Sequence, residues 1–154
     1  MRIAYGDYVK QTATQVFGWN GKKNEAGRHL LQWWGTDVVR KKSPSFWVDT
    51  IIRLAIVLDG VVDYLLIDDI RFPNEISCWF TPDLSKKFES GLEVCVVRVN
   101  RPGHVSKLTS EQLQHLSETA LDNFKGFDEI LNAEDLPSLV FEIKEKFGAI
   151  TGIK

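Results

Sequence analysis

The sequence is poor in the residues that build metal centres and disulfide frameworks. Its 154 residues include two cysteines, three histidines and one methionine. No CxxC pair is present, and the histidines do not have the spacing of metal ligands. Cys78 and Cys95 lie within the apolar strings SCWF and EVCVV, which predicts buried, reduced thiols rather than a disulfide or a metal site.

A charge excess and long apolar runs are also missing. The formal net charge is -2, which gives no support to general nucleic-acid binding, because such proteins usually carry a strongly basic face or tail. The longest apolar run, around residues 54–58, is far short of the roughly 20 residues that span a membrane. The first residues, MRIAYGDYVK, lack the pattern of a signal peptide. We therefore expect a cytoplasmic protein that does not enter a membrane.

Alternating strands and helices are predicted by apolar periodicity and by turn residues. The length and the 44% hydrophobic content fit one domain, residues 1–154, with a real core. Asp7 is a candidate cap for a helix that ends at Gly18, and Ser43 is one for a helix that begins at Pro44. We expect strands at residues 2–5, 62–68, 92–100 and 127–131, and helices at 8–17, 25–42, 44–59 and 135–147.

The predicted strands are near-continuous apolar runs separated by helices, which is typical of parallel strands buried on both faces. The expected fold is therefore α/β, with three layers: a mostly parallel sheet and helices on both of its faces. Ligands of such folds bind beyond the carboxyl ends of the strands. That rule selects residues 68–75, residues 100–104 and the loop after Tyr5 as the rim of a site.

The stretch 76–91 is the least regular part, because Pro82 interrupts any helix there. Trp79 and Phe80 precede this break. They either fill the core or form an insertion that contacts a partner.

The string DDIRFPNE, residues 68–75, places two carboxylates and an arginine at the end of an apolar strand. Asp68 or Asp69 could hold a hydrated Mg²⁺, as an acidic residue does in many phosphoryl-transfer enzymes. Arg71 could bind a phosphate with two hydrogen bonds. The alternative is an internal Asp–Arg pair that fixes the turn.

The string GRHLLQWWGTDVVR, residues 27–40, places Arg28, Gln32 and Asp37 near one polar helical face. Trp33 and Trp34 point about 100° apart on a helix, so one can face the core while the other stacks on a flat ligand. The alternative is two core tryptophans at a helix crossing.

Two further motifs follow later in the chain. Arg101, directly after a predicted strand, either reaches the same rim as Arg71 or is a solvated loop residue. In HLSE, residues 115–118, Ser117 and Glu118 resemble a helix cap and its first turn.

Several strings together resemble one protein family. GRHLLQWWGTDVVRKKSPSFWVD, IDDIRFPNE, VNRPG, HLSETALDNF and FKGFDEILN occur in an order and wording similar to bacterial and phage deoxynucleoside monophosphate kinases. The resemblance covers the chain from Arg2 to about Phe147, and DIRFPNE and LLQWWGTD are its most specific parts. It implies a P-loop nucleoside-monophosphate-kinase fold.

The resemblance also implies site residues. Arg71 looks like a phosphate-binding or catalytic arginine, and Asp68 or Asp69 looks like the acidic residue near Mg²⁺, with Asp68 taken as catalytic. The residues that it places on the nucleotide side are Arg28, Trp33, Trp34, Thr36, Asp37, Arg40, Arg71, Asn74, Glu75, Arg101, Ser117 and Glu118.

The sequence departs from that family at the ATP-binding loop. Such kinases carry a strand, a glycine-rich loop ending in a lysine, and a helix, and this loop wraps the phosphates of ATP. Here only GWNGKK, residues 18–23, contains the right residue types, and its spacing is wrong. In this fold the missing strand lies inside the sheet, so its loss would expose the edges of its neighbours. We therefore predict a homodimer or a higher oligomer.

Three functions are compatible with this pattern. The first is a nucleotide-binding protein that sequesters or senses its ligand through the monophosphate-side pocket, with no certain cofactor. The second is a deoxynucleoside monophosphate kinase that uses ATP and Mg²⁺, with the P-loop lying outside this sequence or supplied by a partner. The third is a protein-interaction scaffold that uses Trp79 and Phe80.

Overall fold

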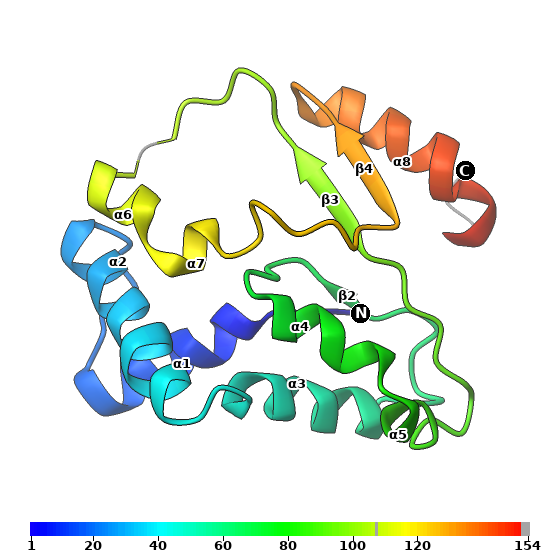
Figure 1. The fold of residues 1–154 in the computed structure, drawn as a ribbon, viewed down its shortest axis with the longest axis horizontal. Coiled ribbons are helices and arrows are strands. Elements are labelled where there is room, and N and C mark those ends of the chain that lie inside the picture. The colour runs from blue at the N-terminus through cyan, green and yellow to red at the C-terminus, as the bar shows by residue number, and fades with distance from the viewer. Residues whose placement is uncertain (107, 152–154) are drawn as a thin grey trace. The chain divides into compact units, whose positions relative to one another are not determined.

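The structure is a computed structural model that describes residues 1–106 and 108–151 (Figure 1). Two compact units make up the chain. The larger unit holds residues 1–93 and 110–123, and the smaller unit holds residues 94–109 and 124–154. The larger unit contains β1 (Arg2–Ile3), α1 (Tyr5–Phe17), α2 (Glu25–Gln32), the π-helix η1 (Trp33–Arg40), α3 (Phe46–Val57), β2 (Leu66–Ile67), α4 (Pro73–Ser77), the 3₁₀-helix η2 (Cys78–Phe80), α5 (Pro82–Ser85), α6 (Ser110–Gln114) and α7 (Leu116–Thr119).

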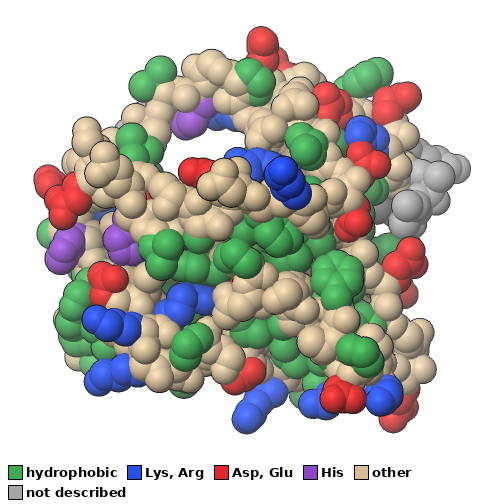
Figure 2. Space-filling model, in the orientation of Figure 1, with side chains coloured by type: hydrophobic (Ala, Val, Ile, Leu, Met, Phe, Trp, Pro, Cys, Tyr) green, Lys and Arg blue, Asp and Glu red, His purple; other side chains and the backbone are tan. Residues whose placement is uncertain are grey.

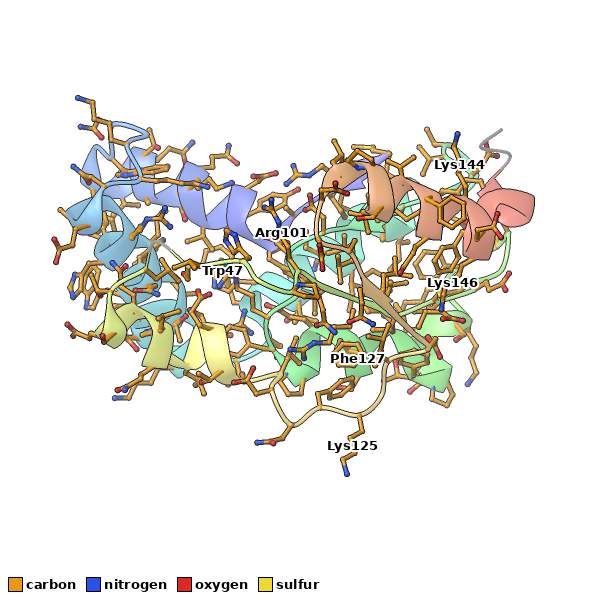
Figure 3. All side chains as sticks on the ribbon, turned by 90° about the horizontal axis from the view of Figure 1, so that it is seen from above. Trp47, Arg101, Lys125, Phe127, Lys144 and Lys146 are labelled. Carbon is orange, nitrogen blue, oxygen red and sulfur yellow. The ribbon has the colours of Figure 1, made fainter. Side chains whose placement is uncertain are left out.

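The larger unit is built from helices around one short parallel strand pair. Arg2 pairs with Leu66 in β1 and β2, and the Met1 ammonium group donates a 2.6 Å hydrogen bond to the Tyr64 carbonyl. Buried side chains come mainly from α1, α3 and α4 and include Trp47 (labelled in Figure 3) and Ile51. The core therefore lies between helices rather than on the two faces of a broad sheet.

Helix α1 begins at Tyr5, so the expected loop after Tyr5 does not exist. The Asp69 carboxylate accepts hydrogen bonds from the backbone N–H groups of Tyr5 (2.9 Å) and Gly6 (2.7 Å), which caps the helix. Asp7, the predicted cap, instead binds Lys10 and Arg2 from inside the first turn. The predicted stop is confirmed, because Gly18 ends α1 with a left-handed φ of 65°.

The expected single α-helix over residues 25–42 is divided. Residues 25–32 form α2, and residues 33–40 form the π-helix η1. Gly35 lies close to α1, since a Cβ built on it would lie 3.1 Å from Cγ1 of Val9. Its carbonyl accepts a 3.0 Å hydrogen bond from Nε1 of Trp47 on α3. The wider turn changes the directions of the side chains that follow it, and such segments are frequent at functional sites.

The next helix and the irregular stretch differ from prediction in detail. Helix α3 begins at Phe46 after Ser45, so Ser43 is not its cap. Residues 76–91 contain the end of α4, the short helix η2 and α5, and Pro82 lies in the first turn of α5. Trp79 is buried, as core filling requires, whereas Phe80 is 55% exposed.

The smaller unit contains β3 (Val97–Asn100), β4 (Glu129–Asn132) and α8 (Leu136–Thr151). The two strands are parallel, with Val97 opposite Glu129. The Arg98 guanidinium lies 5.4 Å from the ring centre of Phe127, which Figure 3 labels. Helix α8 confirms the predicted last helix and packs beside β4 (Figure 1).

The expected three-layer α/β fold is wrong. About 52% of the chain is helical, and the described residues contain only two parallel sheets of two strands each. The run 62–68 contributes two strand residues, and Leu66 is 61% exposed. An apolar run indicates that a segment tends to be buried. A strand that is buried on both faces also needs a neighbouring strand on each of its edges. Each strand here has one partner, so these runs stay short and partly exposed.

The sequence composition led to expectations about the two cysteines and about membrane-spanning segments. Cys78 is a half-buried thiol, whereas the Cys95 side chain is exposed, so the predicted burial of Cys95 is wrong. Among the described residues, no helix combines the length and the apolar character that crossing a bilayer requires.

Candidate functional site

Glu75 of α4 is a buried carboxylate with three hydrogen-bond donors. Its Oε1 accepts from Nη2 of Arg40 at 2.5 Å, which makes a nearly buried ion pair. Its Oε2 accepts from the backbone N–H groups of Arg71 (2.7 Å) and Phe72 (3.1 Å). One carboxylate therefore joins the end of η1 to the strand-end motif DIRFPNE.

The environment of Glu75 acts on its pKa in two directions. Burial raises the pKa of the Glu75 carboxyl, because removal from water disfavours the charged form. The two backbone donors and the Arg40 guanidinium lower it, and burial has the larger effect.

Arg40 is held on three sides. Its guanidinium lies 3.8 Å above the ring centre of Phe72, and its Nη1 donates to Oδ1 of Asn74 at 3.3 Å. Asn74 in turn donates to the Pro44 carbonyl at 3.0 Å. Among the residues that the structure describes, the Nε atom of Arg40 is buried and has no hydrogen-bond partner. Arg40 is therefore a support beneath the motif rather than a cation presented to solvent.

Arg71 is the cation that this support presents. Its backbone N–H is fixed by Glu75, while its side chain is 48% exposed. Nη1 donates to the Ser117 carbonyl at 3.2 Å and to the Glu118 carboxylate. The side chain thus extends from the motif to α7.

His115 orders the start of α7. Its Nδ1 accepts from the Ser117 backbone N–H at 3.2 Å and lies 2.9 Å from the Ser117 hydroxyl. Its Nε2 lies 3.7 Å from an oxygen of Asp37 on η1. The predicted cap was Ser117, but the capping group is the His115 side chain, because Ser117 lies inside the helix. The sequence signal for this role is the histidine of the HLSE string, although the motif by itself marks only Ser117 and Glu118.

Contacts between described residues join one set of residues from η1, α4, α7 and the loops before α4 and α7, which we call the Arg71 network. Its members are Asp37, Arg40, Arg71, Asn74, Glu75, His115, Ser117 and Glu118.

Four other residues predicted on the nucleotide side lie in the same unit but outside this network. Trp34 donates from Nε1 to Thr12 at 2.8 Å and packs edge-on against Phe17. Trp33 also contacts Phe17 and is 40% exposed. Arg28 donates to the Lys23 carbonyl at 3.1 Å, and Thr36 is half-buried in η1. Of the two tryptophans, Trp33 therefore has the more accessible ring.

The carboxylates predicted for Mg²⁺ are engaged by the chain itself. Asp68 accepts from Nε of Arg2 at 2.7 Å. Both oxygens of Asp69 accept backbone N–H groups at the start of α1, where a cation would be repelled by the same donors. Within residues 1–106 and 108–151, no group of three or more His, Cys, Asp or Glu side chains could hold a metal ion. Asp69 therefore does not fit a Mg²⁺ site, and Asp68 would have to exchange Arg2 for the cation.

The GWNGKK string lies in the loop between α1 and α2 rather than after a strand. The backbone of Lys22 within it is already engaged. The Lys22 N–H donates to Oδ1 of Asn20 at 3.1 Å, and the Lys22 carbonyl accepts from Trp19. The loop does not fit the phosphates of ATP.

Arg101 belongs to the smaller unit, so its expected place beside Arg71 stays a prediction. Its Nε donates to the Glu134 carbonyl at 3.2 Å, and Figure 3 labels it. With Glu134 and residues 102–105 it lines an open depression of about 420 Å³.

Comparison with known proteins gives no relative for this chain: no family model, curated protein or solved structure matches it.

Proposed function

We propose that the protein binds a mononucleotide through the Arg71 network and sequesters or senses it rather than phosphorylating it. The observation that carries the proposal is the Arg71 guanidinium, half-exposed and supported by a buried ion pair. A guanidinium can bind two oxygens of one phosphate at once. A fixed backbone beneath it reduces the conformational freedom lost when a ligand binds.

The rest of the ligand requires an aromatic surface and polar groups. Trp33 offers an accessible ring on which a nucleobase can stack. Asp37, exposed on η1, offers a carboxylate that can accept hydrogen bonds from a sugar or a base. The proposed ligand therefore has one phosphate group, a sugar and a flat base.

Binding without transfer is proposed because of what surrounds the network. Phosphoryl transfer depends almost wholly on positioning and on neutralising charge around the transferred group. Asp68 and Asp69 are engaged elsewhere, and the loop at residues 18–23 does not fit ATP. A protein without a Mg²⁺ site and an ATP-binding loop loses phosphoryl-transfer rate to a far greater extent than it loses affinity for a monophosphate.

Calorimetry with the four deoxynucleoside monophosphates tests the proposal. We expect Arg71→Ala to weaken binding by about tenfold or more, because it removes hydrogen bonds to a charged group. Arg53→Ala, which removes an exposed arginine of α3, is the matched control and leaves binding unchanged. Absence of binding by the wild type contradicts the proposal.

The same samples test the two alternative functions. ADP release in a coupled assay with Mg-ATP and a deoxynucleoside monophosphate, abolished by Arg71→Ala, would establish the kinase. The scaffold depends on Trp79 and Phe80, of which Trp79 is buried and Phe80 is exposed. A cellular function lost on Phe80→Ala and retained on Arg71→Ala would establish it.

We also propose that the chain forms a homodimer or a higher oligomer in the cytoplasm. Figure 2 shows hydrophobic side chains exposed among charged ones, and the exposed apolar residues include Tyr64 and Leu66 beside or within β2. A strand pair with open edges and an exposed apolar face favours association with another chain. The half-buried free thiol of Cys78 is consistent with a reducing compartment.

A further inference from the structure

Arg71 already holds an anion from its own chain. Its Nη1 contacts the Glu118 carboxylate, and Glu118 is the less exposed partner, at 23% against 48%. The Ser117 hydroxyl also donates to Glu118 at 3.3 Å. A carboxylate and a phosphate offer a guanidinium the same kind of oxygen acceptor. The Glu118 carboxylate therefore occupies part of the surface that a phosphate needs.

Arg71 and Glu118 differ in how firmly the structure around them fixes their backbones. The backbone of Arg71 is fixed by the buried Glu75 carboxylate. Glu118 lies on α7, a helix of four residues whose N-terminal end is capped by His115. Separation of the pair is therefore expected to move α7 rather than Arg71.

We infer that Glu118 is an internal competitor for Arg71, which an entering phosphate must displace. The inference rests on the proposed function and adds a residue that lowers the affinity of the same site for phosphate. Replacing a carboxylate by a phosphodiester exchanges one single negative charge for another. A phosphate monoester carries -1.5 to -2 charges at about pH 7 and is attracted more strongly. Every phosphate must break the same Arg71–Glu118 ion pair, so Glu118 weakens binding of monoesters, diesters and cyclic nucleotides by the same factor.

Substitution of Glu118 by glutamine tests this inference, because it removes the charge and keeps the size. The matched control is Glu111→Gln, on exposed α6, which changes net charge equally without touching Arg71. The probes are deoxyadenosine 5′-monophosphate, its 3′,5′-cyclic analogue and inorganic phosphate, titrated by calorimetry at one salt concentration.

We expect Glu118→Gln to tighten binding of the monophosphate and of inorganic phosphate by about two- to fivefold, the range of a partly exposed ion pair. The cyclic analogue gains by the same factor, because the same ion pair is broken whichever phosphate enters, and the preference for the monoester is unchanged. The gain disappears in the Arg71→Ala background, and Glu111→Gln leaves all affinities unchanged.

The outcomes separate the two proposals. Unchanged or weaker binding by Glu118→Gln, with normal binding by the wild type, overturns the competitor and leaves the proposed function standing. A gain that persists without Arg71 also overturns it. If no probe binds to the wild type or to Glu118→Gln, the proposed function fails and this inference fails with it.

Discussion

At the scale of single residues, the Arg40–Glu75 pair supports the candidate site. It is nearly buried, and Glu75 also accepts the two backbone N–H groups that shape the motif. Replacing both charges of such a pair by apolar groups is often tolerated, whereas removing one charge leaves the other uncompensated. Single substitutions are therefore the informative ones.

Glu75→Gln is expected to lower the free energy of unfolding by about 3–5 kcal/mol, because Arg40 keeps a buried charge without its counterion. Urea denaturation measures the change. Glu89→Gln, at an exposed glutamate in the same unit, is the control and should change it by less than about 0.5 kcal/mol. Equal stability of the two variants would contradict the structural role of Glu75.

The thiols give a second prediction. Burial raises the pKa of Cys78 to about 11, so at pH 8 this group is a protonated thiol and reacts slowly. Iodoacetamide is expected to label the exposed Cys95 first and to label Cys78 faster as the pH approaches 11. Mass spectrometry measures the labelling rate of Cys95 in the Cys78→Ser variant and that of Cys78 in the Cys95→Ser variant. Faster labelling of Cys78 at pH 8 would rule out this burial.

At the scale of elements, Asp69 distinguishes a helix cap from a metal ligand. Asp69→Ala removes the acceptor of two N–H groups at the start of α1, and we expect a loss of about 0.5–2 kcal/mol. The loss should be equal with and without Mg²⁺, as followed by thermal unfolding. Asp63→Ala, at an exposed aspartate before β2, is the control. Mg²⁺ that stabilised the wild type but not Asp69→Ala would restore the metal interpretation.

Asp59 joins the end of α3 to residues 89–90. Its carboxylate accepts the Ser90 hydroxyl and the N–H groups of Ser90 and Glu89, which lower its pKa below the ordinary 3.8. A lowered pKa stabilises the fold above the unfolded-state value and loses this effect as the pH falls.

We therefore expect Asp59→Asn to be less stable than the wild type at pH 7, with a difference that shrinks as the pH falls below 3.8. Denaturation curves over a series of pH values measure it. A stability difference between the two proteins that is constant with pH would exclude a stabilising role for the ionised Asp59 carboxylate.

At the scale of the whole molecule, the proposed self-association depends on the exposed apolar strand. Sedimentation of the wild type should show a species of at least twice the 17.6 kDa chain mass. Leu66→Lys in β2 is expected to shift it to the monomer, whereas Val57→Lys, exposed on α3, leaves it unchanged. A wild type that stays monomeric at high concentration would refute the proposal.

Some of this architecture was readable in the sequence because its causes are local. Apolar periodicity predicts α3 and α8, and a glycine with freedom for a positive φ marks the end of α1. The strings around Arg40, Arg71 and Glu118 were singled out together, and the structure connects them. Their placement on one site came from resemblance rather than from spacing, because no local rule links residues so far apart.

Tertiary structure alone decided the rest. The partners of Asp69 and Glu75 lie 64 and 35 residues away, and whether a carboxylate caps a helix, pairs with arginine or meets a metal depends on what the fold brings to it. The same holds for the strands, because an apolar run becomes a buried strand only where other strands occupy its edges. The sequence determined which segments tend to be helical or buried, and the tertiary structure determined their partners, since hydrogen bonds and burial are satisfied between distant segments.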